Sequence, residues 1–180
     1  MLNAEDSVLL IIDIQEKLLR AVFNKEELEK KSGIITKTAA ILNIPIFVTE
    51  QYPTGLGETV TALKNIFAEN TKICEKTDFN AFINKDILKN FSNLNRKQVL
   101  ICGIETHICV FQTAEFLINS EYDVTIICDA CGSRSSKEYD LGLRSLEHAG
   151  AKIKTTEMVI FELLKSSKHP NFKDVQALIK

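Results

Sequence analysis

Three side chains that could carry out nucleophilic catalysis stand at or just beyond the ends of expected strands: Asp13, Lys76 and Cys109. Cysteine attacks carbonyl carbon as the thiolate, so its proton must be lost to solvent or to a neighbouring base. A lysine ammonium and a helix N-terminus favour the thiolate, and a buried carboxylate can accept the thiol proton. Each residue alone has an ordinary explanation, as a helix cap, a solvated lysine or a core cysteine.

The elements expected around these residues bring them together. Apolar, β-branched runs alternate with helical patterns, which indicates a parallel sheet with helices on both faces. Strands are expected at 7–13, 44–49, 72–75, 98–102, 123–128 and 151–155, and helices at 25–42, 84–91, 106–119, 135–148 and 156–164, with a last helix after Pro170. We therefore expect one domain over residues 1–180, a three-layer doubly wound α/β sandwich with a mainly parallel six-stranded sheet. Ligands bind such sheets beyond the carboxyl ends of the strands, where all three side chains should meet.

Three motifs along the chain resemble those of the isochorismatase-like cysteine hydrolases. They are Leu-Ile-Ile-Asp13-Ile-Gln, Lys76-Thr-Asp-Phe-Asn-Ala-Phe82 and Gly103-Ile-Glu-Thr-His-Ile-Cys109-Val. They occur in the order that the family has, and the resemblance covers nearly the whole chain. The stretch Thr49-Glu-Gln-Tyr-Pro-Thr-Gly-Leu-Gly57 is similar to the isochorismatase domain-containing subgroup.

The resemblance implies a role for each motif. The family's catalytic Asp, Lys and Cys match Asp13, Lys76 and Cys109. A cis peptide bond would fall between Ile104 and Glu105, and the amides of Glu105 and Cys109 would form an oxyanion hole. The implied reaction is metal-independent hydrolysis of a small amide-type or related substrate through a thioester, with Asp13 as the base. The resemblance further implies a homo-oligomer, either a dimer or a tetramer, and no cofactor.

Four further residues are candidates for contact with the substrate. Gln51, Tyr52 and Phe79 follow the second and third strands, and His107 lies two residues before Cys109. Ordinary loop packing is the alternative for the first three. His107 could also act as a base, but Asp13 already fills that role, so a histidine at the pocket rim is the better interpretation.

The sequence supports a metal site, a nucleotide-binding site or a redox motif less well than it supports a cysteine hydrolase. Residues 50–59 contain no histidine or aspartate, where metal-dependent nicotinamidases of the family hold an ion, and His107, His148 and His169 have no ligand spacing. The chain has neither a G-x-G-x-x-G motif nor a P-loop. The segment Cys128-Asp-Ala-Cys131 is a C-x-x-C, for which packing is a better explanation than redox activity.

The amino-acid composition limits the classes of partner that the protein can bind. The 22 basic and 24 acidic residues give no basic footprint for nucleic acid. No apolar stretch is long enough to span a membrane, and the N-terminus lacks the basic segment that a signal peptide needs. The number of cysteines, five, is odd, and intracellular thiols are normally reduced, so we expect no disulfide framework. We expect a cytoplasmic protein with a small-molecule substrate. A non-catalytic oligomeric interaction protein and a thiol redox sensor that uses Cys109 remain as alternatives.

Overall fold

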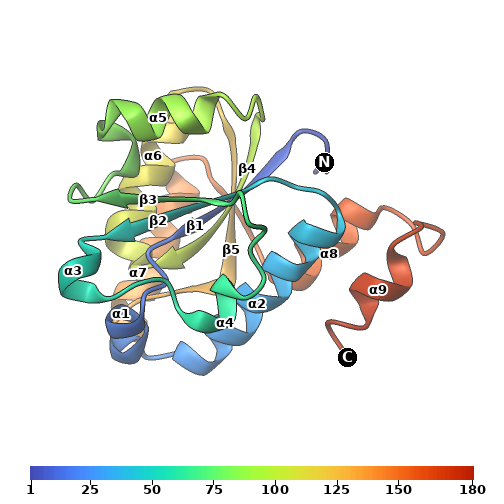
Figure 1. The fold of residues 1–180 in the computed structure, drawn as a ribbon, viewed down its shortest axis with the longest axis horizontal. Coiled ribbons are helices and arrows are strands. Elements are labelled where there is room, and N and C mark those ends of the chain that lie inside the picture. The colour runs from blue at the N-terminus through green and yellow to red at the C-terminus, as the bar shows by residue number, and fades with distance from the viewer.

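A computed structural model describes residues 1–180, and a six-stranded sheet organises them (Figure 1). The strands lie in the order β3-β2-β1-β4-β5-β6, and every neighbouring pair is parallel. They are β1 (Ser7–Ile12), β2 (Ile46–Gln51), β3 (Lys72–Lys76), β4 (Gln98–Ile104), β5 (Asp123–Gly132) and β6 (Lys152–Lys154). The α/β fold class and the six parallel strands expected from the sequence are confirmed.

Helices cover both faces of the sheet. They are α1 (Glu16–Ala21), α2 (Lys25–Ile41), α3 (Pro53–Leu56), α4 (Thr61–Lys64), η1 (Ala81–Ile83), α5 (Lys85–Ser92), η2 (Thr106–Val110), α6 (Phe111–Asn119), α7 (Ser136–His148), α8 (Thr156–Leu164) and α9 (Phe172–Gln176). Residues of α2, α8 and α9 share one hydrophobic core with the sheet, and residues of α5, α6 and α7 share the other. Figure 1 shows α5 and α2 on opposite sides of the strands.

Strand β1 lies at the centre of both cores. All six of its residues are buried, and its side chains alternate between the two cores, with Leu9 and Ile11 in one and Val8, Leu10 and Ile12 in the other. A strand covered on both faces has no polar side, which explains its uninterrupted apolar run. This packing fixes the position at which β1 ends, and therefore the position of Asp13.

The largest departures from the expected elements are short helices. The sequence did not predict α1, α3, α4 or η1, because helices of three to six residues are too short to display a helical period. The helix expected at 106–119 begins as the π-helical turn η2 and continues as α6. Pro45 precedes β2, and its carbonyl accepts a hydrogen bond from the Leu9 amide.

No helix of the structure is both long enough and apolar enough to cross a membrane.

Gly103 lies opposite Ile12 in the β1–β4 ladder, where the two backbones approach closely. A Cβ atom at Gly103 would lie 2.3 Å from the carbonyl oxygen of Ile12, a contact that forces the strands apart. We expect Gly103→Ala to lower the free energy of unfolding by at least about 1–3 kcal/mol, the typical effect of overpacking. Urea denaturation followed by circular dichroism measures this change.

The matched control is Gly33→Ala, in the interior of α2, where an added Cβ would meet no atom within 4 Å. Removing a helical glycine should raise the free energy of unfolding by roughly 0.5–1 kcal/mol. Equal effects of the two substitutions would contradict the close approach at Gly103.

Candidate active site

Asp13 lies at the carboxyl edge of the sheet, directly after β1, and its side chain is fully buried. Its backbone is left-handed, with φ of 53°, a conformation that aspartate tolerates better than most residues. Both carboxylate oxygens are held: Thr49 Oγ1 donates to Oδ1 at 2.7 Å, and Lys76 Nζ donates to Oδ2 at 2.6 Å. The carboxylate therefore has a fixed orientation.

Lys76 ends β3 and reaches Asp13 across β2. Its side chain is 1% exposed, so the ammonium is almost wholly removed from water. Besides Asp13, Nζ donates to Oε1 of Gln51 at 2.6 Å and to the carbonyl oxygen of Asp78 at 3.3 Å. A buried ammonium needs a partner for each of its three protons, and Lys76 has three.

Cys109 lies in η2, the turn that joins β4 to α6. It is 7% exposed, and both Asp13 and Lys76 are close enough to shift its pKa. The turn is closed by the amides of Ile108 and Val110, which donate to the carbonyl oxygen of Glu105 at 3.0 and 3.2 Å. The structure thus brings the three reactive side chains together at one edge of the sheet.

The pKa values of this group describe a resting site with a neutral thiol. Burial first, and then the negative charge of Asp13, raise the pKa of Cys109 to about 12, although Lys76 opposes the shift. The sequence led us to expect Lys76 and the helix N-terminus to favour the thiolate, and burial outweighs them. Burial also raises the pKa of Asp13, against the opposing effects of Lys76 and Thr49. A carboxylate with a raised pKa is a better acceptor for the thiol proton.

The buried thiols should make the fold less stable in alkali. Burial raises the pKa of both Cys102 and Cys109 to about 12, from 9.0 in the unfolded chain. The folded state thus holds these protons more tightly, so stability is full below pH 9 and falls as the pH rises toward 12. We expect a loss of about 1.4 kcal/mol per pH unit for each such thiol in denaturant titrations across this range.

The comparison variant for this effect is Cys102→Ala. Its unfolding free energy should fall less steeply with pH than that of the unmodified chain, because one titrating thiol is gone. Parallel slopes for the two proteins would contradict the assignment.

The peptide bond between Ile104 and Glu105 is cis, at the position where the family resemblance implies one. The amide of Glu105 donates no hydrogen bond to an acceptor within the chain. Its side chain is 13% exposed and accepts a hydrogen bond of 2.8 Å from Nε of Arg134. Glu105 is therefore held at its carboxylate while its backbone N–H remains available.

Of the four residues expected to contact substrate, Gln51 and Tyr52 lie beside Lys76. Gln51 donates from Nε2 to the carbonyl oxygen of Thr77 at 2.7 Å, so both ends of its amide are bound to protein groups. Tyr52 is 57% exposed and lines a pocket of about 270 Å³ together with Lys76 and Asp78.

The other two candidates differ from each other in exposure. Phe79 is 53% exposed at the surface. His107 faces the protein: Nδ1 is 3.0 Å from Oγ of the buried Ser133, and Nε2 is 3.8 Å from a carboxylate oxygen of Glu138. His107 thus connects the Cys109 turn to the segment that leads into α7. Contact of these four residues with a substrate stays a prediction.

Two residues of the site were not assigned by sequence reasoning. Thr49 orients the Asp13 carboxylate, and Gln15 pairs with the backbone of Gln51 through two hydrogen bonds, one at its Oε1 atom and one at its Nε2 atom. Thr49 lies opposite Ile12 in the β1–β2 ladder, so the convergence of strand ends could have pointed to it. Gln15 stands in the Asp-x-Gln motif, but the motif alone gives no partner for its side chain.

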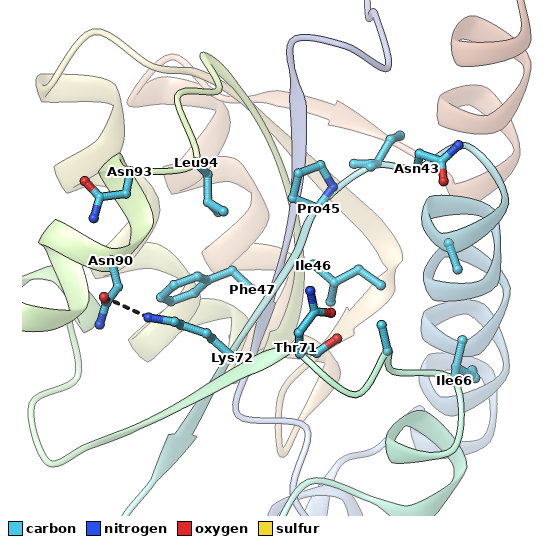
Figure 2. Close-up of a pocket in the computed structure, with 14 residues that line it drawn as sticks. Asn43, Pro45, Ile46, Phe47, Ile66, Thr71, Lys72, Asn90, Asn93 and Leu94 are labelled. Atoms are coloured by element: carbon cyan, nitrogen blue, oxygen red, sulfur yellow. Dashed lines mark hydrogen bonds between the residues drawn. The ribbon is translucent and has the colours of Figure 1, made fainter.

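A pocket larger than the one beside Lys76 is shown in Figure 2, and none of its lining residues belongs to the group around Asp13. It measures about 640 Å³ and lies where β2 and β3 begin, at the opposite edge of the sheet. Asn43 and Asn93 line this pocket and lie just after the ends of α2 and α5. Lys72, another lining residue, donates a hydrogen bond of 3.0 Å from Nζ to Oδ1 of Asn90. Its lining contains no cysteine, histidine, aspartate or glutamate, so it offers no nucleophile or base of the kind found at the carboxyl edge.

No group of three or more His, Cys, Asp or Glu side chains in the structure is placed to hold a metal ion.

Comparison with known proteins agrees with the three motifs. The model of the Isochorismatase domain family matches residues 7–158. Isochorismatase family protein 1A of Dictyostelium discoideum is 38% identical over 98% of this chain and 87% of its own length. Isochorismatase domain-containing protein 2 of Danio rerio is 36% identical over 99% of this chain and 89% of its own.

Solved structures have the same fold. The MAR1 ribonuclease from Caenorhabditis elegans superposes with a TM-score of 0.93 at 39% identity, over 99% of this chain and 91% of that one. YcaC from Pseudomonas aeruginosa, with covalent acrylamide, gives 0.92 at 25% identity, over 98% and 90% of the two chains. YcaC from Escherichia coli, an octameric hydrolase of unknown specificity, gives 0.88 at 25% identity, over 99% and 94%. Since the family model covers most of the chain and relatives align over nearly all of it, the chain belongs to the isochorismatase family.

Proposed function

We propose that this protein is a metal-independent cysteine hydrolase that cleaves the C–N bond of a small amide-type or related substrate. The observation that carries the proposal is the buried arrangement of a thiol, a carboxylate with a raised pKa and an ammonium at one sheet edge. A neutral thiol beside a basic carboxylate suits proton transfer that accompanies attack.

Each step assigns the proton to a named group. Asp13 takes the Cys109 proton as Sγ attacks the carbonyl carbon, and Lys76 stabilises the thiolate. The tetrahedral intermediate collapses, and the departing amine takes the proton from Asp13, which leaves a thioester. Asp13 then removes a proton from water, the hydroxide attacks the thioester, and the acid leaves as the thiol regains its proton.

The negative oxygen of the tetrahedral intermediate needs donors that are in place before the reaction. We propose the amides of Glu105 and Cys109 for this role. The Glu105 amide is free of partners within the chain, and the ion pair with Arg134 holds the residue in position. Loss of one such donor typically raises the barrier by about 2.7–4 kcal/mol.

Two relatives support parts of this proposal. YcaC of P. aeruginosa carries covalent acrylamide, which reacts with nucleophiles through its vinyl carbon, so this relative supports a reactive nucleophile on this fold. The octamer of E. coli YcaC supports assembly of this chain as a homo-oligomer. We propose a dimer or larger assembly, and a reducing cytoplasmic setting that keeps the Cys109 thiol available.

The raised pKa of Cys109 argues against a thiol redox sensor, because sensor cysteines are exposed thiolates of low pKa. The name of the C. elegans relative suggests a ribonuclease activity, but the net charge of −2 provides no overall positive charge for binding RNA.

The test is a substrate panel with mass spectrometry of the protein. Small amides, esters and a single-stranded RNA are incubated with the protein, with and without EDTA. We expect turnover of at least one amide or ester, an acyl adduct on Cys109 at early times, and no effect of EDTA. Cleavage of RNA alone, turnover that requires a metal, or turnover that persists without Cys109 would each overturn the proposal.

A further inference from the structure

Gln51 is a neutral side chain that forms a short hydrogen bond with the Lys76 ammonium. The two residues lie opposite each other in the β2–β3 ladder, and Oε1 of Gln51 accepts a hydrogen bond of 2.6 Å from Nζ. The orientation of the amide is unambiguous, because lysine only donates and the Thr77 carbonyl bound by Nε2 only accepts. Both polar atoms of the Gln51 side-chain amide therefore have a partner within the protein.

The backbone of Gln51 is fixed as firmly as its side chain. Gln15 accepts a hydrogen bond of 2.7 Å from the Gln51 amide and donates one of 3.0 Å to the Gln51 carbonyl oxygen. A second contact of Nε2 holds Gln15 on the carbonyl oxygen of Gly57. Gln15 is fully buried. Its side-chain hydrogen bonds to the Gln51 backbone continue the pairing of β1 with β2 beyond the end of β1.

In the proposed reaction, the negative charge beside the Lys76 ammonium moves from one residue to another. In the resting state the negative charge near Lys76 is on Asp13, and after proton transfer it is on Cys109. The partner of the ammonium therefore changes during each reaction. An acceptor without charge can hold the ammonium throughout without competing for it.

We propose that Gln51 is a positioning residue, whose side-chain carbonyl holds the Lys76 ammonium in place while the negative charge passes from Asp13 to Cys109. The inference rests on the proposed hydrolase function and assigns Gln51 a role other than contact with substrate. Gln15 supports it by fixing the backbone from which Gln51 extends.

Other ionisable side chains near the nucleophile have partners of their own. On η2 and α7, His107 lies beside Glu138, and at the entrance of the turn Glu105 is bound by Arg134. The charged groups that act on the thiol are Asp13 and Lys76. A change at position 51 should therefore reach Cys109 through Lys76.

The decisive variant is Gln51→Glu, which keeps the size of the side chain and adds a permanent negative charge. The carboxylate should bind the ammonium in competition with the thiolate. We expect iodoacetamide to alkylate Cys109 about tenfold more slowly at a given pH below the midpoint, equivalent to a shift of about one unit in the pH profile. Peptide mapping by mass spectrometry distinguishes alkylation of Cys109 from that of the other cysteines.

A second variant, Gln51→Met, removes the acceptor without adding charge. It should also slow alkylation and lower kcat, with little change in KM. The matched control is Gln176→Glu in α9, which adds the same charge far from the sheet edge and should leave the profile unchanged.

Alkylation requires no substrate, so it separates the two roles of Gln51. If both variants alkylate like the unmodified chain and only KM rises, Gln51 contacts substrate and the positioning role is wrong. The proposed hydrolase function is measured by turnover in the substrate panel, so it can fail or stand independently of the alkylation profile.

Discussion

A Cys109→Ala protein should fold like the unmodified chain and lose hydrolysis by at least about a thousandfold, since removal of a catalytic nucleophile costs this much or more. Cys109 supplies the atom that forms the covalent intermediate, and no other thiol stands beside both Asp13 and Lys76. Turnover of the best panel substrate and intact-protein mass spectrometry measure the effect. No acyl adduct should accumulate on the variant.

The matched control is Cys74→Ala. Cys74 lies on β3 and is partly exposed, so it is the more accessible thiol, but it has no basic partner: burial raises its pKa and only Lys72 opposes the shift. Its removal should leave both turnover and the adduct intact. If the adduct disappears in Cys74→Ala and persists in Cys109→Ala, the nucleophile is Cys74 and the assignment to Cys109 is wrong.

Lys76→Ala should have the largest effect on stability. The Asp13–Lys76 pair is almost completely buried, with an N–O distance of 2.6 Å. Removing one partner of such a pair leaves an uncompensated charge and typically costs about 3–5 kcal/mol. We expect this loss in denaturant titrations, together with loss of turnover.

The pH dependence of this loss identifies its cause. Burial already raises the pKa of Asp13 and Lys76 lowers it, so removal of Lys76 raises it further. A carboxyl group with a raised folded-state pKa destabilises the fold as the pH climbs above its unfolded value. The variant should therefore be less impaired in mild acid, where Asp13 is protonated, than at neutral pH.

Asp13→Asn/Lys76→Met is the control that separates stability from chemistry. Replacing both members of a buried pair by neutral groups of similar volume is often neutral or stabilising. The double variant should recover most of the lost stability and remain inactive. Recovery of turnover would show that the pair has no catalytic role.

Much of the fold could be predicted because its central strands are buried on both faces. Apolar runs such as residues 7–12 are stable only when both faces are covered. The rule that ligands bind beyond the carboxyl ends of parallel strands predicts that Asp13, Lys76 and Cys109 lie at one edge of the sheet. The motif order supplied the family. What the sequence could not supply is the ionisation state of Cys109, because burial and two opposing charges decide it and their balance depends on distances.

The side-chain network around Lys76 was beyond sequence reasoning for a similar reason. Gln51 looked like a pocket residue because it follows a strand at the functional edge. Its actual contacts depend on the register of β2 with β3 and on Gln15, which lies 36 positions earlier in the chain. Glutamine side chains adopt too many conformations for such contacts to be inferred from spacing alone.

The position of β3 in the sheet has a consequence for how the protein fails. β3 is an outer strand, bonded only to β2, whereas β1 and β4 lie in the interior. Outer elements open more readily than the core, at a lower free energy than global unfolding. The ammonium thus belongs to an edge strand, whereas the carboxylate directly follows the interior strand β1 and the thiol lies in the turn that follows the interior strand β4. Mild heating or denaturant would then inactivate the molecule reversibly while its core is still folded, and a binding partner that covers the free side of β3 would protect its activity before it protected its fold.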